Sequence, residues 1–337
     1  MALVVKCNNG IVTDEYLELI GSALQECGHA VNYTNNFRDA LKLEKSEVVV
    51  VARTVEAFQL IIKGYKKVIV WFQGIEPEES YMSHHSKLRY HVLSGMERVI
   101  LKKSWFKLFV STEMVRHYQR KYKLLIPESS YYVMPCQNTE LPPEAFESED
   151  KYKKNIFVYT GSMAVWQKFE DTVKVYKEIE NSGIKDCEFW VYTGEKEEAR
   201  RLLEKNDIKN YKIDFVKNTE LPRVLADAKY GFIIREDTPV NRVATPTKIS
   251  TYLSCGLIPI YSACLAGFHD IATSMKYVIC YEEGNISQID NFCFMKINKN
   301  EVLNEYQKIF ERYYDLTYHK NQLTRLINLK SDLGKEQ

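Results

Sequence analysis

Short apolar runs alternate with amphipathic stretches along almost the whole chain, and the alternation occurs in two consecutive series. In the first series we expect strands at residues 2–5, 30–33, 47–52, 67–72, 106–110 and 131–134. In the second series we expect strands at 156–159, 188–192, 212–216, 230–234, 257–261 and 277–280. The run Val48–Val51 is apolar at every position, as a strand covered on both faces needs. A repeated β-α alternation predicts parallel sheets with helices on both faces, so the sequence indicates two α/β domains.

The segment between the two series differs in composition from both. Pro135, Pro142 and Pro143 are followed by a charged run at 147–151, which is typical of an interdomain linker. A length of 337 residues also suggests two domains, at roughly 150 residues each. We expect a Rossmann-like domain at 1–137, a linker at 138–154, a second Rossmann-like domain at 155–300, and a helical region at 301–337 that packs back towards the first domain. Ligands bind outside the carboxyl ends of the strands in such sheets, so the two domains are expected to face each other across a cleft.

Composition and charge exclude several classes of protein. The 46 Lys and Arg against 45 Asp and Glu give a formal net charge of +1, so the chain lacks the basic excess of a nucleic-acid binder. No apolar run reaches the roughly 18 residues of a membrane-spanning helix. The first residues lack the charged region of a signal peptide, and we expect a cytoplasmic protein. None of the eight cysteines forms a Cys-x-x-Cys pair, and no metal site is expected.

A lysine near the start of a predicted helix is the first candidate for chemistry. We expect this helix to begin at Pro246, with Thr245 as its cap and Thr247 and Lys248 in its first turn. A lysine is unfavourable at the positive end of a helix dipole, and a bound anion would reverse that penalty. The pattern therefore indicates a phosphate site. The alternative is a lysine whose amine simply reaches solvent.

Charged residues follow the predicted strand at 230–234. Arg235, Glu236, Asp237 and Asn241 lie at its carboxyl end, where they could meet ribose hydroxyls or phosphates. The alternative is a solvated loop.

The predicted strand at 156–159 is also followed by candidate residues. Gly161 allows a backbone to approach a ligand closely, and Ser162 and Lys168 follow it before a helix. The pattern matches neither a Gly-x-Gly-x-x-Gly nor a Walker sequence, so a plain connection between strand and helix is the alternative.

The segment 73–80 follows the predicted strand at 67–72 and is expected to be a loop. Three carboxylates crowd it, and crowded carboxylates can raise one another's pKa and act in acid–base catalysis. The candidates are Gln73, Gly74, Glu76, Glu78 and Glu79. The alternative is an acidic surface turn.

The predicted long helix at 86–103 mixes cations with apolar residues. Its cations are Lys87, Arg89, Arg98, Lys102 and Lys103. Such a helix could lie against an anionic membrane. The alternative is an ordinary helix that faces the core and has a basic solvent face.

Taken together, these segments resemble those of bacterial glycosyltransferases of the GT-B type, particularly the retaining family-4-like branch of polysaccharide and capsule synthesis. The strongest likeness is at residues 246–260, where that family reads Pro-x-Lys-x-x-Glu-Tyr-Leu-Ala-x-Gly-x-Pro-Val-Ile. The other segments that carry the resemblance are 235–244, 159–162 and 71–80. The resemblance covers essentially the whole chain and implies a GT-B fold.

The resemblance implies a transferase that moves a sugar from a nucleoside-diphosphate sugar, with a UDP-sugar as first choice, to a glycan or lipid-linked glycan. It implies no metal and no further cofactor, no nucleic acid, and a peripheral contact with the inner face of the membrane as an option. The residues with implied catalytic roles are Lys248, Arg235 and Glu79. The implied donor-binding residues are Gly161, Ser162, Lys168, Glu236, Asp237, Asn241, Thr247 and Thr251. The implied acceptor-side residues are Gln73, Gly74, Glu76 and Glu78.

The chain departs from the family at one position. Thr251 stands where the family has the second glutamate of a Glu-x₇-Glu pair, and Val243 stands at the position of the first. Glu236 or Asp237 could replace the first carboxylate. This departure keeps two alternatives open: a non-catalytic homologue that supports a partner transferase, and a nucleotide-sugar epimerase.

Overall fold

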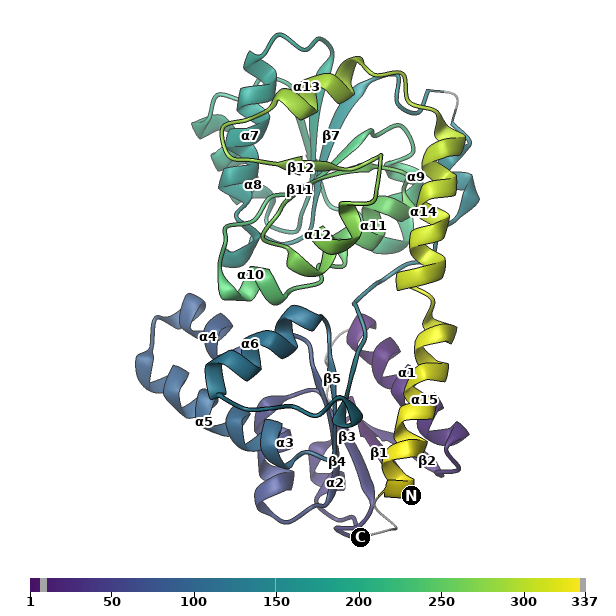
Figure 1. Ribbon diagram of the computed structural model, residues 1–337. Helices are drawn as coiled ribbons and strands as arrows, with labels where there is room; N and C mark the ends of the chain where they lie inside the picture. Colours follow the sequence, from purple (N-terminus) through teal and green to yellow (C-terminus); the bar gives the residue numbers. More distant parts are fainter. Residues whose placement is uncertain (7–10, 149, 334–337) are drawn as a thin grey trace. The chain divides into compact units, whose positions relative to one another are not determined.

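The computed structural model describes residues 1–6, 11–148 and 150–333, which fold into two compact units (Figure 1). Unit 1 contains Met1–Pro135 and the C-terminal segment from Asp315, and unit 2 contains Cys136–Tyr314. Each unit is built on one six-stranded sheet in which every described pairing is parallel. These two helix-flanked sheets confirm the predicted α/β fold class with two doubly wound domains.

The sheet of unit 1 has the strand order β2-β1-β3-β4-β5-β6. Its strands are β1 (Ala2–Val5), β2 (Val31–Thr34), β3 (Val48–Val51), β4 (Lys67–Phe72), β5 (Phe106–Phe109) and β6 (Tyr131–Val133). β3 is buried at all four positions, because helices cover both faces of the sheet. The strand order reverses between β1 and β3, as in other doubly wound sheets.

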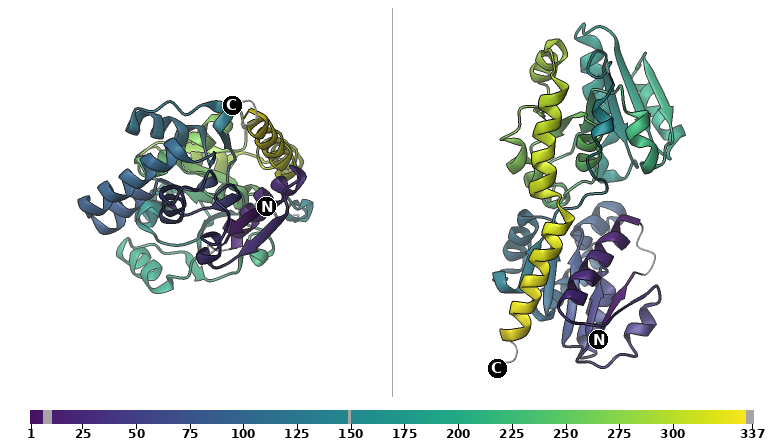
Figure 2. Two further views of the ribbon diagram at one scale, coloured as in Figure 1. Left: turned by 90° about the horizontal axis from the view of Figure 1, so that it is seen from below. Right: turned by 90° about the vertical axis from the view of Figure 1, so that its right-hand side faces the viewer.

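The helices of unit 1 lie on both sides of this sheet. They are α1 (Ile11–Glu26), α2 (Phe37–Ala40), α3 (Thr54–Ile62), α4 (Glu76–His84), α5 (Lys87–Lys103), α6 (Thr112–Tyr122) and α15 (Leu316–Leu333). Figure 1 shows α1 and α15 on one side and α3, α5 and α6 on the other. α15 packs along α1, as Figure 2 also shows. No helix in the described ranges is both long enough and apolar enough to cross a bilayer.

The expected loop at 73–80 is wrong in its second half, because α4 begins at Glu76. Pro77 stands in the first turn of α4, where its missing N–H costs no hydrogen bond and its fixed φ suits a helix. The next helix, α5, begins after Ser86, whose hydroxyl oxygen accepts from the N–H of Arg89 at 3.4 Å.

The sheet of unit 2 has the strand order β12-β11-β10-β7-β8-β9. Its strands are β7 (Asn155–Thr160), β8 (Cys187–Tyr192), β9 (Tyr211–Asp214), β10 (Tyr230–Ile233), β11 (Ile258–Ser262) and β12 (Ile279–Tyr281). Numbered within this unit alone, that is the order 6-5-4-1-2-3 of a dinucleotide-binding Rossmann fold. The order reverses between β7 and β10, so the expected ligand site lies outside the carboxyl ends of these two strands.

The helices of unit 2 include two that matter for the site, α7 (Phe169–Asn181) and α11 (Lys248–Ser254). The others are α8 (Lys196–Lys205), α9 (Leu221–Val224), α10 (Pro239–Val243), α12 (Ala266–Ala272), α13 (Ser287–Phe294) and α14 (Lys299–Tyr313). The segment that precedes β7 packs on this unit: Phe146 and Tyr152 belong to its hydrophobic core. The buried amine of Lys151 donates to the backbone oxygens of Ala226 and Cys255 at 2.9 and 2.8 Å.

A close contact between β10 and α11 generates a stability prediction. The Tyr252 ring is fully buried, and a Cβ added to Gly231 would lie 2.4 Å from Cδ2 of that ring. We expect Gly231→Ala to lower the free energy of unfolding by about 1–3 kcal/mol, because the ring or the strand must shift. The control is Gly194→Ala, where a Cβ meets nothing within 4 Å and the effect should stay within about 0.5 kcal/mol. Urea unfolding measures both, and equal stabilities would contradict this packing argument.

Candidate active site

The reversal point of the unit 2 sheet brings together three of the predicted residues. Gly161 follows the end of β7, Arg235 follows β10, and Lys248 begins α11. Gly161 has a φ of +113°, and a Cβ there would lie 2.8 Å from Cε of Lys248. The lysine side chain therefore passes directly over a position that only glycine can occupy without strain. The N–H of Gly161 donates to Tyr192 O at 2.9 Å, so what this residue supplies is space.

Arg235 and Lys248 are both buried, with exposed fractions of 7% and 9%. The amine of Lys248 donates to Oε1 of Gln167 at 2.9 Å, and the guanidinium of Arg235 donates to the backbone oxygen of Gln167 at 2.7 Å. The amine also lies 3.8 Å from the centroid of the Tyr159 ring. All three partners are uncharged. Within the described part of the chain, neither cation forms an ion pair with a carboxylate.

Two buried cations without a counter-charge make this place electrostatically unfavourable for the empty protein. Burial lowers the pKa of Lys248 well below its usual value, and the neighbouring Arg235 charge lowers it further. Burial also lowers the pKa of Arg235. A buried charge is costly unless it is paired, so an anion placed between these groups would relieve both penalties. The arrangement is chemically suited to bind a phosphate or diphosphate.

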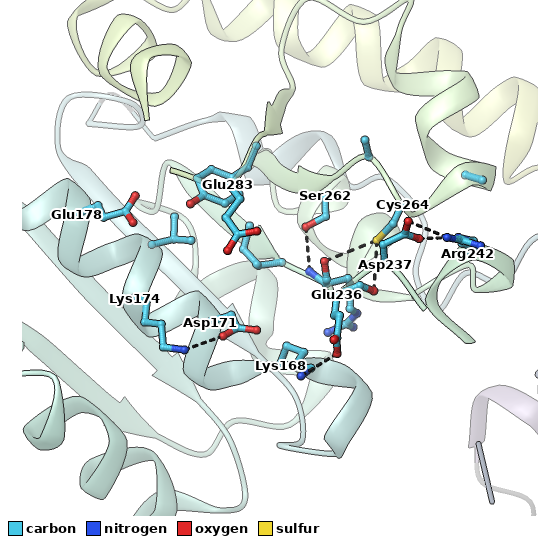
Figure 3. Close-up of a pocket in the computed structure, with 16 residues that line it drawn as sticks. Lys168, Asp171, Lys174, Glu178, Glu236, Asp237, Arg242, Ser262, Cys264 and Glu283 are labelled. Carbon is cyan, nitrogen blue, oxygen red and sulfur yellow. Dashed lines mark hydrogen bonds and ion pairs between the residues drawn. The ribbon is translucent and has the colours of Figure 1, made fainter. Parts of the chain in front are cut away.

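A cavity of about 930 Å³ opens beside Arg235, between α7 and the carboxyl ends of β10, β11 and β12, and Lys248 is not among the residues that line it (Figure 3). Arg235 lines it together with residues of both charges. The amine of Lys168 pairs with Glu236 at 2.7 Å, which raises the pKa of Lys168. Figure 3 shows Asp237 turned towards Arg242, whose guanidinium donates to both carboxylate oxygens at 2.5 and 2.8 Å. Among the predicted donor carboxylates, Glu236 is therefore held only by a single lysine, whereas Asp237 is bound through both oxygens.

Three further predicted donor residues form hydrogen bonds within unit 2 and do not line this cavity. Asn241 is 1% exposed, and its amide donates to the backbone oxygen of Glu236 at 3.0 Å. The hydroxyl of Thr251 donates to Oδ1 of Asn138 at 2.9 Å, so it connects α11 to the segment before β7. Ser162 accepts at its backbone oxygen from the hydroxyl of Tyr159 at 2.6 Å.

The predicted start of the helix at Pro246 is wrong by two residues. α11 begins at Lys248, and Thr247 is its N-cap without a side-chain hydrogen bond. Thr245 does not cap it, because its hydroxyl oxygen accepts from the N–H of Cys136 at 3.2 Å. A long-range contact that the local sequence does not reveal has replaced the expected local one.

Sequence reasoning missed two residues that hold the cation pair in place. Gln167 contacts both cations, through its side chain and through its backbone oxygen. Ser262, at the end of β11, accepts from the N–H of Arg235 at 2.9 Å through its hydroxyl oxygen. In the sequence, the one local signal that points to Gln167 is its position immediately before Lys168. The one signal that points to Ser262 is its position at the end of a predicted strand.

The predicted acceptor-side residues belong to unit 1, at the carboxyl end of β4. Glu79 folds back so that Oε1 accepts from the N–H of Ile75 at 3.2 Å. A Cβ on Gly74 would lie 1.9 Å from the same oxygen, so only glycine leaves room for this carboxylate. Burial raises the pKa of Glu79 to about 7, with the nearby carboxylates of Glu76 and Glu78 acting in the same direction and the hydrogen bond from the N–H of Ile75 opposing it. Gln73 accepts from the hydroxyl of Thr13 at 3.0 Å.

Glu78 forms ion pairs with two side chains of unit 1. Its carboxylate lies 2.8 Å from the Lys121 amine and 3.3 Å from Nε2 of His117. Burial acts to raise the pKa of Glu78, but the hydrogen bond from His117 and the charge of Lys121 outweigh it and hold that pKa below its usual value. Lys121 also pairs with Glu97 of α5 at 3.1 Å. Glu78 thus joins α4 to α6, whereas Glu79 keeps a titratable carboxyl beside the loop.

No group of three His, Cys, Asp or Glu side chains that could hold a metal ion occurs among the residues the structure describes.

No protein-family model and no curated protein matches the sequence. The fold, however, is similar to solved glycosyltransferases. WaaG, a glycosyltransferase involved in lipopolysaccharide biosynthesis, superposes with a TM-score of 0.63 at 12% identity, over 96% of this chain and 100% of that one. An alpha-glucosyltransferase solved with UDP-glucose and DNA gives a TM-score of 0.58 at 12% identity, over 96% and 98% of the two chains.

S. aureus TarM, solved with UDP, gives a TM-score of 0.61 at 10% identity. The match covers 86% of this chain but only 58% of TarM, so this chain spans little more than half of that protein. Together these similarities confirm the expected GT-B fold.

The raised pKa of Glu79 generates a prediction for the pH dependence of stability. Because this carboxyl binds its proton more tightly in the folded state, its contribution is complete below the usual pKa of 4.5 and is lost as the pH rises through about 7. Glu79→Gln keeps an acceptor for Ile75 and cannot titrate. Between pH 4.5 and 7.5 we expect the wild type to lose roughly 1–3 kcal/mol of unfolding free energy relative to this variant. Urea unfolding over that pH range measures the difference, and parallel curves would show that Glu79 titrates as an ordinary carboxyl.

Proposed function

We propose that this protein is a glycosyltransferase that moves a sugar from a nucleoside-diphosphate sugar to a glycan or glycolipid acceptor. One observation carries the proposal: Arg235 and Lys248 are buried without a carboxylate partner at the reversal point of a Rossmann sheet. Nucleotides bind at that point of such folds. A UDP-sugar is the first choice of donor, since solved neighbours of this fold carry UDP or UDP-glucose.

The chemistry follows from where charge develops during sugar transfer. As the bond between the anomeric carbon and the diphosphate breaks, negative charge grows on the leaving phosphate oxygen. Fixed cations aimed at that oxygen lower the barrier, because they are already oriented when the charge appears. Arg235 and Lys248 are proposed to do this, and Gly161 leaves the space that the Lys248 side chain needs to reach its place. Two cations can supply the charge that a divalent metal would, so the proposed reaction needs no metal.

The proposed roles of the other residues follow their surroundings. Glu236 lines the cavity and is held by one lysine, so it is the best-placed carboxylate for ribose or sugar hydroxyls. Glu79 is proposed to serve the acceptor side, where a carboxyl with a pKa of about 7 can exchange a proton near neutral pH. Retention of the anomeric configuration rests on the resemblance of the segment 246–260 to the retaining branch.

The proposed setting is cell-surface polysaccharide synthesis on the cytoplasmic side. WaaG, a solved neighbour of this fold, acts in lipopolysaccharide biosynthesis. The seven cysteines that the structure describes are all free, as is usual in a reducing compartment.

A second candidate function is a non-catalytic homologue that supports another transferase. The observation that favours it is Thr251, whose hydroxyl is bound to Asn138 where the related family has a glutamate. Such a scaffold has no use for two unneutralised buried cations, and for this reason we prefer the enzyme.

Nucleotide binding tests the donor site directly. We expect UDP, in a panel with GDP, dTDP, ADP and CMP, to raise the thermal midpoint, by an amount equivalent to about 2.7 kcal/mol at 100 times its Kd. Lys248→Met and Arg235→Met should each weaken UDP binding by at least about tenfold, because each removes a charge-assisted contact. The matched control is Lys196→Met, which removes an exposed lysine that pairs with Asp214 on the surface of the same unit.

The outcomes distinguish the transferase from the non-catalytic scaffold. No response to any nucleotide, or equal affinity in all three variants, would contradict the donor site. Nucleotide binding without turnover of any nucleotide sugar, with or without acceptor, would favour the scaffold. Turnover that persists in EDTA and gives a product of unchanged anomeric configuration would support the metal-free and retaining parts of the proposal.

A further inference from the structure

Four lysine side chains are buried in the part of the chain that the structure describes: Lys107, Lys151, Lys229 and Lys248. The amines of Lys151 and Lys229 each donate to two oxygen atoms. Those of Lys107 and Lys248 each donate to a single oxygen within the described residues. Because an ammonium group has three N–H donors, Lys107 in unit 1 resembles the proposed phosphate-binding lysine of unit 2 more than it resembles the two well-bonded lysines.

Lys107 is a buried cation without a counter-charge. It stands in β5, is 3% exposed, and donates to the backbone oxygen of Ser104 at 3.0 Å. It forms no ion pair with a carboxylate of the described residues. Burial lowers the pKa of Lys107 to about 8, and the charge of Lys330 acts in the same direction. Most of these amines are therefore still charged at pH 7, in a place where an unpaired charge is costly.

A cavity of about 360 Å³ adjoins this amine. It lies at the amino ends of β5 and β6, beside the last turn of α5 and the C-terminal part of α15. Lys102, Lys107 and Lys330 line it, and its lining contains no Asp or Glu among the described residues. Neither Lys102 nor Lys330 forms an ion pair within that part of the chain. Three elements that are far apart in the sequence thus each supply a lysine to one small cavity.

Ser104 adds a second, independent observation at the same cavity. It lines the cavity and is 6% exposed. Its hydroxyl is buried and has no hydrogen-bond partner among the described residues. Buried polar groups in folded proteins are nearly always hydrogen-bonded, so an exception needs an explanation. The hydroxyl can donate, as the three lysines can, and an acceptor shared by all four groups is what the cavity lacks.

We propose that this cavity, which we call the Lys107 cavity, binds a phosphate group. A phosphate carries close to two negative charges at pH 7 and several strong acceptor oxygens, so it can meet the lysines and the Ser104 hydroxyl together. The volume is at the lower end of the roughly 300–1,000 Å³ of small-molecule sites. It therefore suits inorganic phosphate or a small phosphomonoester better than a nucleotide sugar.

The Lys107 cavity is separate from the predicted acceptor-side residues. Those residues follow the carboxyl end of β4, whereas the cavity lies at the amino ends of β5 and β6, which are parallel to β4 in the same sheet. A bound phosphate would connect α5 and β5 to α15, the helix that returns to unit 1 from the end of the chain. We infer that the ligand stabilises this docking of α15 and takes no part in sugar transfer.

Other occupants satisfy the cavity less completely. A water molecule can accept hydrogen bonds from Lys107 and Ser104, but it brings no negative charge. A single carboxylate brings one charge and two oxygens to three lysines and a hydroxyl. A phosphate group matches both the charge and the number of donors.

Calorimetric titration in phosphate-free buffer tests the proposal on the full-length chain. The Arg235→Met, Lys248→Met double variant is used, so that phosphate bound by the proposed donor site does not contribute and failure of that site leaves this test unchanged. Inorganic phosphate, glycerol 3-phosphate and acetate are compared at a constant ionic strength set with sodium chloride. We expect saturable binding of a phosphate compound, at least about tenfold tighter than that of acetate.

The two phosphate compounds distinguish the source of the ligand. A tighter Kd for glycerol 3-phosphate than for inorganic phosphate would support a phosphomonoester, and the reverse order would support free phosphate. The absence of saturable binding, or equal affinity for acetate, would overturn the proposal.

Two variants in the same background locate the binding. Lys107→Met should weaken phosphate binding by at least about tenfold, because it removes the buried charge. Ser104→Ala should weaken it by at least about threefold without lowering the thermal midpoint, since it deletes a hydroxyl that has no partner in the free protein. Unchanged phosphate affinity in either variant would overturn the proposal.

A further pair of variants changes only side chains that are not fully buried, so that folding is preserved. Lys102→Gln with Lys330→Gln should weaken phosphate binding by about threefold. The matched control is Lys87→Gln with Arg89→Gln, two exposed cations at the opposite end of α5 from Lys102. The control should bind phosphate as tightly as the background does. Equal losses in both pairs would show a general effect of surface charge and overturn the proposal.

Discussion

The burial of two like charges without a counter-charge is the constraint on which the rest of unit 2 depends. Arg235 and Lys248 are held at the carboxyl ends of β7 and β10, and their partners are an amide side chain, a backbone oxygen and an aromatic ring. These partners orient the cations but leave their charge uncompensated. A protein tolerates such a cost where a ligand supplies the missing charge, because the same groups that lower the stability of the empty protein then bind tightly.

The surrounding structure keeps the cation pair in place. Tyr252 of α11 accepts from the N–H of Thr160 at 3.0 Å and donates to Phe232 O at 3.3 Å, so one hydroxyl connects β7, β10 and α11. Gly231 leaves room for its ring. Thr251 fixes the other side of α11 to Asn138. The helix that begins with Lys248 is therefore held on two sides, and the lysine has little freedom to move away from Arg235. A fixed charge of this kind stabilises a leaving group without reorganising during the reaction.

The sequence predicts the fold and the two central cations, because those features have local signals. Strand periodicity gives the two parallel sheets, and Lys248 and Arg235 follow directly after recognisable local patterns. It does not predict the contacts that position them, because these join residues far apart in the chain. Gln167 meets Lys248 across 81 positions, and Thr245 meets Cys136 across 109, so the expected cap is lost to a contact that no local pattern shows. At 73–80 the sequence analysis expects a loop, because three carboxylates and a proline are common in turns. The same residues also suit the first turn of a helix, and α4 begins there at Glu76.

The contribution of the phosphates to nucleotide affinity tests the central claim most directly. The account holds that Arg235 and Lys248 lack a carboxylate partner in the empty site and that a diphosphate supplies the missing negative charge. Calorimetric titrations with UDP and with uridine, which lacks the phosphates, measure that contribution. The account predicts that UDP binds the wild type at least about tenfold more tightly than uridine does, and that this difference is lost when Arg235→Met and Lys248→Met are combined. Equal affinities of UDP and uridine for the wild type, or the same difference in the double variant, would contradict it.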